Sequence, residues 1–202
     1  MKFPFFASFI IFALVIRHRV KKQKQQNASQ EQSFWERERQ ANSVRRKSLE
    51  TVNYISIPLE QFPMNILSTD SRIIEYKEQI TLLSSMPIVN LTGYSNTDLK
   101  LAYGVANITH LSECDQNYTL LVQILQKWAN VLYDANYITE AATLMEFAIS
   151  THTDISQTYY KLAEIYAARG DFSHIHDLIE TARQLRSANK NTIVRTLQES
   201  YL

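Results

Sequence analysis

Residues 122–189 carry one apolar pattern twice, at a repeat interval of about 34 residues. Each copy consists of an apolar segment, a short turn and a second apolar segment, which predicts two helices joined by a tight connection. The turns contain Asn136 and Gly170, residue types that accept the left-handed conformation at a helix end. The positions that match across the repeat interval are Trp128 with Leu162, Ala129 with Ala163, Leu132 with Tyr166, Ile138 with Phe172, Leu144 with Leu178, Met145 with Ile179 and Ala148 with Ala182.

The repeated pattern resembles the tetratricopeptide repeat, whose unit is a helix–turn–helix of about 34 residues. Ala129 and Ala163 are small enough for adjacent helices to approach closely, while bulky residues fill the groove opposite. The matching residues are Leu125, Trp128, Ala129, Leu132, Ala141, Met145 and Ala148 in the first unit, and Tyr159, Leu162, Ala163, Tyr166, Gly170, Asp171, Phe172, Ile179 and Ala182 in the second. The resemblance implies antiparallel helix pairs stacked on one another.

The chain departs from the repeat at several positions. The proline that usually closes the unit is absent, and Thr153 and Ser187 stand in its place. Ile175 replaces the small residue that the first unit has at Ala141. The alternative is an ordinary helical bundle in which the repeat interval arises by chance.

If the resemblance holds, stacked pairs form a concave groove that takes an extended peptide or a helix. The residues expected to line the groove are Gln123, Gln126, Asn130 and Tyr133, then Gln157, Tyr160, Lys161 and Glu164. These residues are polar and aromatic with little net positive charge, unlike repeats that clamp a C-terminal carboxylate with paired lysines. The alternative is a solvated face.

Other helices are expected at the ends of the stack, because two units are fewer than the three that such a stack normally needs. The spacing of apolar residues predicts a helix over 70–86, with Asp70 as its N-cap. A second helix is predicted over 98–111, and a capping helix over 192–202. The residues of the second helix that should face inward are Leu101, Val105 and Ile108.

Few residues in this chain break helices. Gly occurs 3 times and Pro 4 times in 202 residues, which is too few for the turns of a β-sandwich or barrel. Residues 52–64 alternate apolar and polar types, but they contain two of the prolines, so we interpret them as an extended arm laid against the helices. The predicted fold class is all-α.

The N-terminus has fourteen uncharged residues, Phe3 to Ile16, followed by five Lys/Arg within eight positions. Basic residues just after an apolar segment resist translocation, and no Ala-x-Ala cleavage pattern follows. We therefore predict a transmembrane helix with its C-terminal side in the cytoplasm, although the segment spans only about 21 Å of a roughly 30 Å hydrocarbon core. A cleaved export signal and a buried core helix are the alternatives.

These features divide the chain into a membrane anchor with a basic flank (1–24), a polar juxtamembrane stem (25–50) and a helical domain (51–202). The stem is predicted to be helical or disordered. Phe34 and Trp35 interrupt it, and could either rest at the membrane interface or pack on the domain.

The net charge of +1 conceals an asymmetry along the chain. Residues 1–50 hold eleven Lys/Arg and four acidic residues, whereas the remainder holds ten and sixteen. A basic stem on an acidic body suits a chain whose first part lies near an anionic surface. It argues against nucleic-acid binding by the body, which would need a basic face.

The sequence has no recognisable catalytic, metal or cofactor motif. His174 and His176 lie two apart on a predicted helix and so point in different directions. Cys114, the single cysteine, has acidic neighbours that would raise the pKa of its thiol rather than activate it. We expect neither an enzyme nor a cofactor, and a catalytic protein with a nonstandard site is the alternative.

These inferences predict a membrane-anchored adaptor or assembly factor that holds a protein or peptide partner in its groove. Two alternatives keep the same module. It could be exported and act as a chaperone-like holder, or it could be a structural membrane subunit that buries its helices against a second copy. The sequence does not name the partner.

Overall fold

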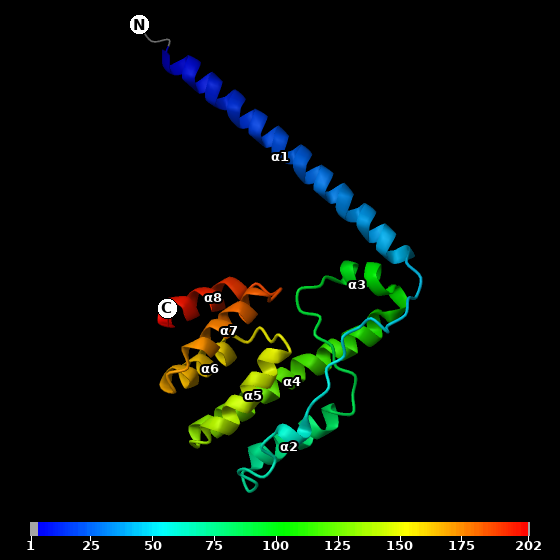
Figure 1. The fold of residues 1–202 in the computed structure, drawn as a ribbon. Helices are drawn as coiled ribbons and strands as arrows, with labels where there is room; N and C mark the ends of the chain where they lie inside the picture. Colours follow the sequence, from blue (N-terminus) through cyan, green and yellow to red (C-terminus); the bar gives the residue numbers. More distant parts are fainter. Residues whose placement is uncertain (1–3, 202) are drawn as a thin grey trace. The chain divides into compact units, whose positions relative to one another are not determined.

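The computed structural model describes the backbone of residues 4–201 and, within that range, every side chain except those of 4–11, 13–15 and 26. The described chain contains helices and no strand, which confirms the all-α class. Its helices, shown in Figure 1, are α1 (Pro4–Ser43), α2 (Ser71–Leu83), α3 (Asn96–Tyr103), α4 (Ile108–Asp134), α5 (Ile138–Ser150), α6 (Ser156–Ala168), α7 (Phe172–Arg183) and α8 (Lys190–Tyr201). Two short 3-10 helices, η1 (Leu59–Gln61) and η2 (Val105–Asn107), complete the set.

Contacts divide the chain into two compact units. The first contains α1, the chain that continues from it to Lys47, and the segment Ser95–Ile108. The second contains Ser48–Tyr94 and the chain from Thr109 onward. The basic N-terminal helix therefore lies in the first unit, and helices α5 to α8 lie in the second.

In the first unit, the last turns of α1 pack against α3. Glu38 accepts a hydrogen bond from the Thr97 hydroxyl and forms an ion pair with Lys100 at 3.1 Å. These two contacts hold the pKa of the Glu38 carboxyl below its usual value. The chain after α1 continues the contact, because the Lys47 amide donates to the Tyr103 carbonyl at 3.0 Å.

The helix predicted over 98–111 is wrong in its extent. It begins at Asn96, after a capping box made by Ser95 and Asp98, and ends at Tyr103 because Gly104 turns the backbone at φ 85°. Val105, expected to face inward, is exposed. The residues of α3 that are buried are Thr97 and Leu99.

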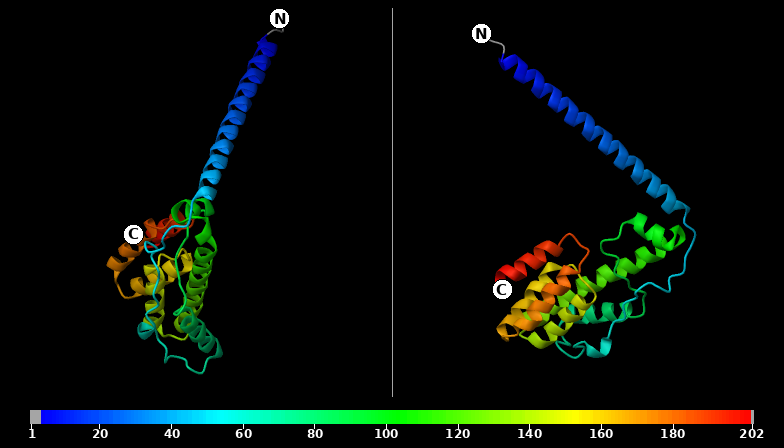
Figure 2. Two further views of the ribbon diagram at one scale, coloured as in Figure 1. Left: turned by 90° about the vertical axis from the view of Figure 1, so that its right-hand side faces the viewer. Right: turned by 45° about the horizontal axis from the view of Figure 1, so that its top comes forward.

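In the second unit, α5 to α8 follow one another as contacting neighbours joined by short connections, which makes them antiparallel (Figures 1 and 2). The helices keep the repeat interval of the sequence, since α5 begins at Ile138 and α7 at its equivalent, Phe172. The largest fully buried side chains of α4 and of this stack are Trp128, Tyr159, Leu121, Leu125, Leu132, Leu144, Met145 and Leu162. Ile193 and Leu197 of α8 are also fully buried, against the last pair.

The helix predicted over 70–86 is present as α2, but it ends earlier than predicted, at Leu83. The Asp70 side chain caps α2 by accepting from the Arg72 amide. The arm that precedes it has no regular secondary structure at 53–58 and buries Phe62, whose ring meets Phe147 edge to face at a centroid distance of 5.2 Å. The backbone of the arm bonds to the loop after α2, where the Ile55 amide donates to the Ile88 carbonyl at 2.9 Å.

Over the part of the chain that the structure describes, no helix is both long and apolar enough to cross a membrane. The predicted transmembrane span is therefore not supported. The physical reason is that the uncharged segment is followed at once by Arg17 and Arg19, so a helical stretch of spanning length takes in several cations. Residues 1–3 of the predicted anchor, and its side chains at 4–11 and 13–15, lie outside the described residues.

Helix α1 continues without a break from this segment through most of the predicted stem. Phe34 and Trp35 are both more than half exposed, and their rings meet edge to face at 5.3 Å between centroids. An interfacial role for these two rings stays a prediction.

Candidate partner-binding surface

The residues predicted to line a partner groove lie on the C-terminal half of α4 and on α6. The two helices contact one another through polar contacts that include four of the eight residues. The structure separates the predicted residues, all of which it describes, into three groups: a surface contact among three residues, a buried contact at Gln126, and residues that make no polar side-chain contact between the two helices.

The exposed contact joins Tyr133 of α4 to Lys161 and Glu164 of α6. The Lys161 ammonium lies 4.2 Å from the centroid of the Tyr133 ring, within cation–π distance. The Tyr133 hydroxyl donates to the Glu164 carboxylate at 3.2 Å. Burial, followed by this hydrogen bond, raises the pKa of the Tyr133 phenol. An aromatic ring is thus held between opposite charges, with Glu164 exposed and the other two half-buried.

Gln126 is not part of an open surface. Its side chain is only 8% exposed, its amide donates to Asn130 at 3.1 Å, and its carbonyl accepts from the hydroxyl of Thr158. The bond to Asn130 lies within α4, and the bond to Thr158 connects α4 to α6 inside the stack. The prediction that Gln126 faces a partner is therefore wrong, because the second helix covers that side of α4.

The remaining predicted residues differ in exposure. Gln123 and Gln157 are exposed and equivalent across the repeat interval. Tyr160 is half-buried and packs against the hydrophobic core. Of the eight residues, those available to a partner are Gln123, Asn130, Tyr133, Gln157, Tyr160, Lys161 and Glu164.

Tyr201 of α8 belongs with this surface, and the sequence analysis missed it. Its ring is half-buried and packs against the hydrophobic core, and burial, followed by the Glu164 charge, raises the pKa of its phenol. Extending the pattern by one more unit would have found it, because Tyr133, Ala167 and Tyr201 follow one another at the repeat interval. The apolar spacing within 192–202 predicted only a capping helix there.

The other chemically reactive side chains do not form a site with these residues. Cys114 is fully buried, and burial, followed by the Glu113 charge, raises the pKa of its thiol. His174 is exposed at the start of α7, where its Nδ1 lies 2.6 Å from Asp171. Among the described residues, no group of three or more His, Cys, Asp or Glu is placed to hold a metal ion.

No protein-family model matches this chain, and neither a curated protein nor a solved structure is similar enough to count as a match.

Proposed function

We propose that this chain is a protein-binding adaptor or assembly factor whose second unit is a tetratricopeptide-like stack. A protein or peptide partner binds on the surface of α4, α6 and α8. The observation that carries the proposal is the Tyr133–Lys161–Glu164 contact, which holds an aromatic ring and two charges together on two adjacent helices. Such preordered aromatic and charged groups are typical of residues that dominate binding energy.

Two further observations support a repeat of this kind. The starts of α5 and α7, and likewise those of α6 and α8, are separated by the repeat interval. The helix ends at Asn136 and Gly170 have the same backbone conformation. A regular stack presents the first helix of each pair on one side, so a partner can contact several helices at once.

Attachment to a membrane is a second part of the proposal. The support is the order of charges, in which a basic segment follows an uncharged one and precedes an acidic body. Cations in this position keep the following chain in the cytoplasm. A reporter fused after Leu202 should therefore work in the cytoplasm, and a reporter that works only outside would favour the exported alternative.

The partner surface is tested by crosslinking full-length protein in cells and identifying what co-purifies. The test variant is Lys161→Gln with Glu164→Gln, which removes both charges around Tyr133. The matched control is Glu180→Gln with Arg183→Gln, an exposed pair at the same spacing on α7. Neither variant changes net charge or buries a polar group.

A protein partner that is lost with the α6 variant and kept with the α7 control would support the proposal. Equal loss with both variants would point to a general electrostatic effect. Unchanged capture with both variants would exclude this surface. Recovery of the chain itself alone, with a doubled mass in solution, would instead favour the self-associating subunit.

A further inference from the structure

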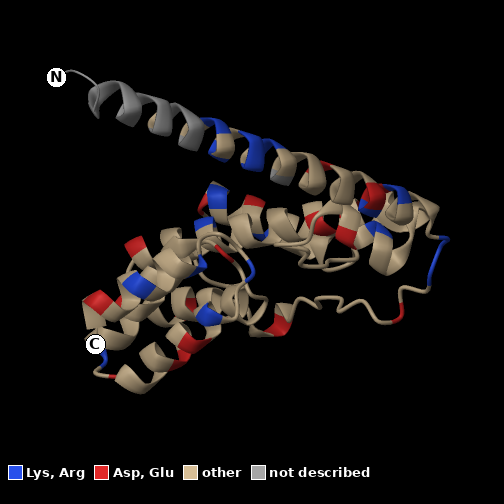
Figure 3. Ribbon diagram, turned by 90° about the horizontal axis from the view of Figure 1, so that it is seen from above, with Lys and Arg blue, Asp and Glu red and all other residues tan. Residues whose placement is uncertain are grey.

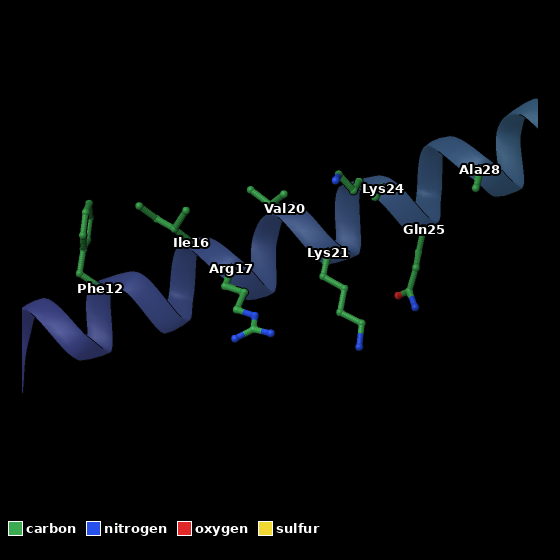
Figure 4. Close-up of a pocket in the computed structure, with 8 residues that line it drawn as sticks. All are labelled: Phe12, Ile16, Arg17, Val20, Lys21, Lys24, Gln25 and Ala28. Atoms are coloured by element: carbon green, nitrogen blue, oxygen red, sulfur yellow. The ribbon is translucent and has the colours of Figure 1, made fainter.

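The described part of α1 carries an exposed apolar row beside a row of cations. Phe12, Ile16 and Val20 follow one another at four-residue spacing and therefore share one side of the helix. They are 62%, 45% and 46% exposed. Figure 4 shows these three side chains projecting from one side of the helix; Arg17 and Lys21 each follow a member of the row by one residue and therefore project about 100° around the helix from it. A hollow follows this part of the helix surface. Every residue that lines it belongs to α1, so it is a face of one helix and not a pocket between elements.

The charge of this face has one sign. Residues 17–24 contain five Lys/Arg, and the first acidic residue of the chain is Glu31. Figure 3 shows the Lys and Arg positions along the described part of α1, before the first acidic position. Contacts of α1 within its own unit lie at its other end, at Arg37 and Glu38, and leave the apolar row exposed.

We infer that the α1 face from Phe12 to Lys24 binds an anionic phospholipid surface. Phe12, Ile16 and Val20 enter the interface, and Arg17, Lys21 and Lys24 meet the headgroup phosphates and carboxylates. The inference rests on the membrane attachment proposed above and adds the lipid class and the residues. Apolar insertion joined to several cations is what gives stable binding to anionic leaflets.

Two other occupants fit the face less well. A nucleic acid would use the cations, but its backbone offers nothing to the three exposed apolar side chains. A second copy of α1 packed in parallel would bring like charges together along 17–24, and one packed antiparallel on the same apolar row would set these cations opposite the uncharged residues 8–15, which offer them no counter-charge. An anionic bilayer satisfies both rows at once.

The test is cosedimentation of full-length protein with vesicles of phosphatidylcholine, with and without phosphatidylserine. We expect binding to the anionic vesicles to be stronger and to weaken with salt. The variant Arg17→Gln/Lys21→Gln/Lys24→Gln should lose about a hundredfold in affinity for anionic vesicles, at about 1 kcal/mol for each cation. Glutamine is a good helix former, so circular dichroism should show an unchanged helix content.

A charge-matched control separates this surface from net charge. The variant Lys127→Gln/Arg169→Gln/Arg195→Gln removes three exposed cations from the second unit and should bind vesicles as the wild type does. The variant Phe12→Gln/Ile16→Gln/Val20→Gln should lose binding to both kinds of vesicle, because it removes the apolar row.

Fluorescence quenching measures whether the apolar row of Phe12, Ile16 and Val20 enters the acyl region of the bilayer. In a Trp35→Phe background, Phe12→Trp should be quenched by lipids with brominated acyl chains, while the buried Trp128 is not. Binding without quenching would overturn the role of the apolar row and leave simple electrostatic adsorption.

The outcomes distinguish this inference from the proposals on which it rests. Equal binding to neutral and anionic vesicles would overturn the lipid class while membrane attachment stands. Binding to neither would overturn both and leave partner capture by the second unit untouched. Tight binding of duplex DNA or RNA, lost with the cation variant and unaccompanied by vesicle binding, would assign the face to nucleic acid. A concentration-dependent dimer that the apolar variant abolishes would assign it to a second copy.

Discussion

Asn136 and Gly170 are equivalent across the repeat interval and hold the same left-handed backbone, with φ of 67° and 71°. Each lies just after a helix and closes it with the same pair of hydrogen bonds. The bonds run from Asn136 N to Tyr133 O and Tyr137 N to Leu132 O, and from Gly170 N to Ala167 O and Asp171 N to Tyr166 O. His152 ends α5 in the same way, with φ of 60°.

Removing the glycine at one of these helix ends and introducing one at another should change the free energy of unfolding in opposite directions. Gly170→Ala should lower the free energy of unfolding by about 1 kcal/mol, since only the backbone conformation opposes a Cβ there and no heavy atom lies within 4 Å of it. His152→Gly should raise the free energy of unfolding by about 0.5 kcal/mol, because the relief of left-handed strain at this exposed residue exceeds the chain entropy that glycine adds to the unfolded state.

Urea unfolding of the full-length protein measures both changes. If Gly170→Ala leaves the midpoint unchanged, the left-handed conformation at this helix end is not a source of strain.

Asn90 joins the loop between α2 and α3 to the loop after α5. Its amide nitrogen donates to the carbonyls of Thr151 and His152 at 2.8 and 3.1 Å, and to the Tyr118 hydroxyl at 3.0 Å. Asn90→Asp keeps the shape but turns a donor into a carboxylate that faces two carbonyl oxygens. We expect a loss of about 2–3 kcal/mol of stability.

Asn117→Asp is the matched control, because Asn117 makes a single bond, to the Pro87 carbonyl at 3.0 Å. It should cost about 1 kcal/mol or less. Equal losses for the two variants, measured by urea unfolding, would mean that the Asn90 bonds do not hold these loops together.

Local signals predicted the parts of the fold that local forces determine. The cap at Asp70 and the turns at Asn136 and Gly170 depend on a few neighbouring residues, and each lies where the sequence indicated. The helix of α3 was predicted, but not its packing, which depends on residues about sixty positions away, as in the Glu38–Thr97 contact. Periodicity within 98–111 gave no sign of that pairing.

Spacing predicted which helices carry the residues of the candidate surface, but not how deeply each residue is buried. Their role in binding a partner stays a prediction. Spacing placed Tyr133 and Glu164 on facing helices, and the structure brings them together. Spacing could not show that α6 covers Gln126, because burial depends on how closely two helices approach and not on either helix alone.

The buried tyrosines predict a loss of stability in alkali. Burial raises the pKa of Tyr118 to about 12, and its hydroxyl donates to the Thr151 carbonyl at 3.1 Å. The folded state keeps the phenol neutral, so this contribution is complete below the unfolded pKa near 10 and is lost as pH rises toward about 12. Burial also raises the pKa of Tyr159 and Tyr166.

The measurement is the urea midpoint as a function of pH above 9. Each such tyrosine should add a slope of up to about 1.4 kcal/mol per pH unit between these limits. Tyr118→Phe should be less stable at pH 8, by about 1 kcal/mol for the lost hydrogen bond, but should show a shallower alkaline decline. Identical slopes in the variant and the wild type would contradict a raised pKa at Tyr118.

Asp171 caps α7 and also bonds the first histidine of that helix. Its carboxylate accepts from the His174 amide and lies 2.6 Å from His174 Nδ1. This hydrogen bond raises the pKa of the imidazole and lowers that of the carboxyl. Because the folded pKa of His174 is raised, the stabilisation it gives is complete below the usual histidine pKa and is lost as pH rises through the raised value.

Asp171→Asn separates the charge from the cap, since asparagine also caps helices well. We expect the His174 titration midpoint, followed by NMR of the ring protons, to fall in this variant, while the start of α7 keeps its helical shifts. Asp171→Ala should lower the midpoint and also fray the helix start. An unchanged midpoint in Asp171→Asn would show that the contact does not persist in solution, and the pH dependence would then have to arise elsewhere.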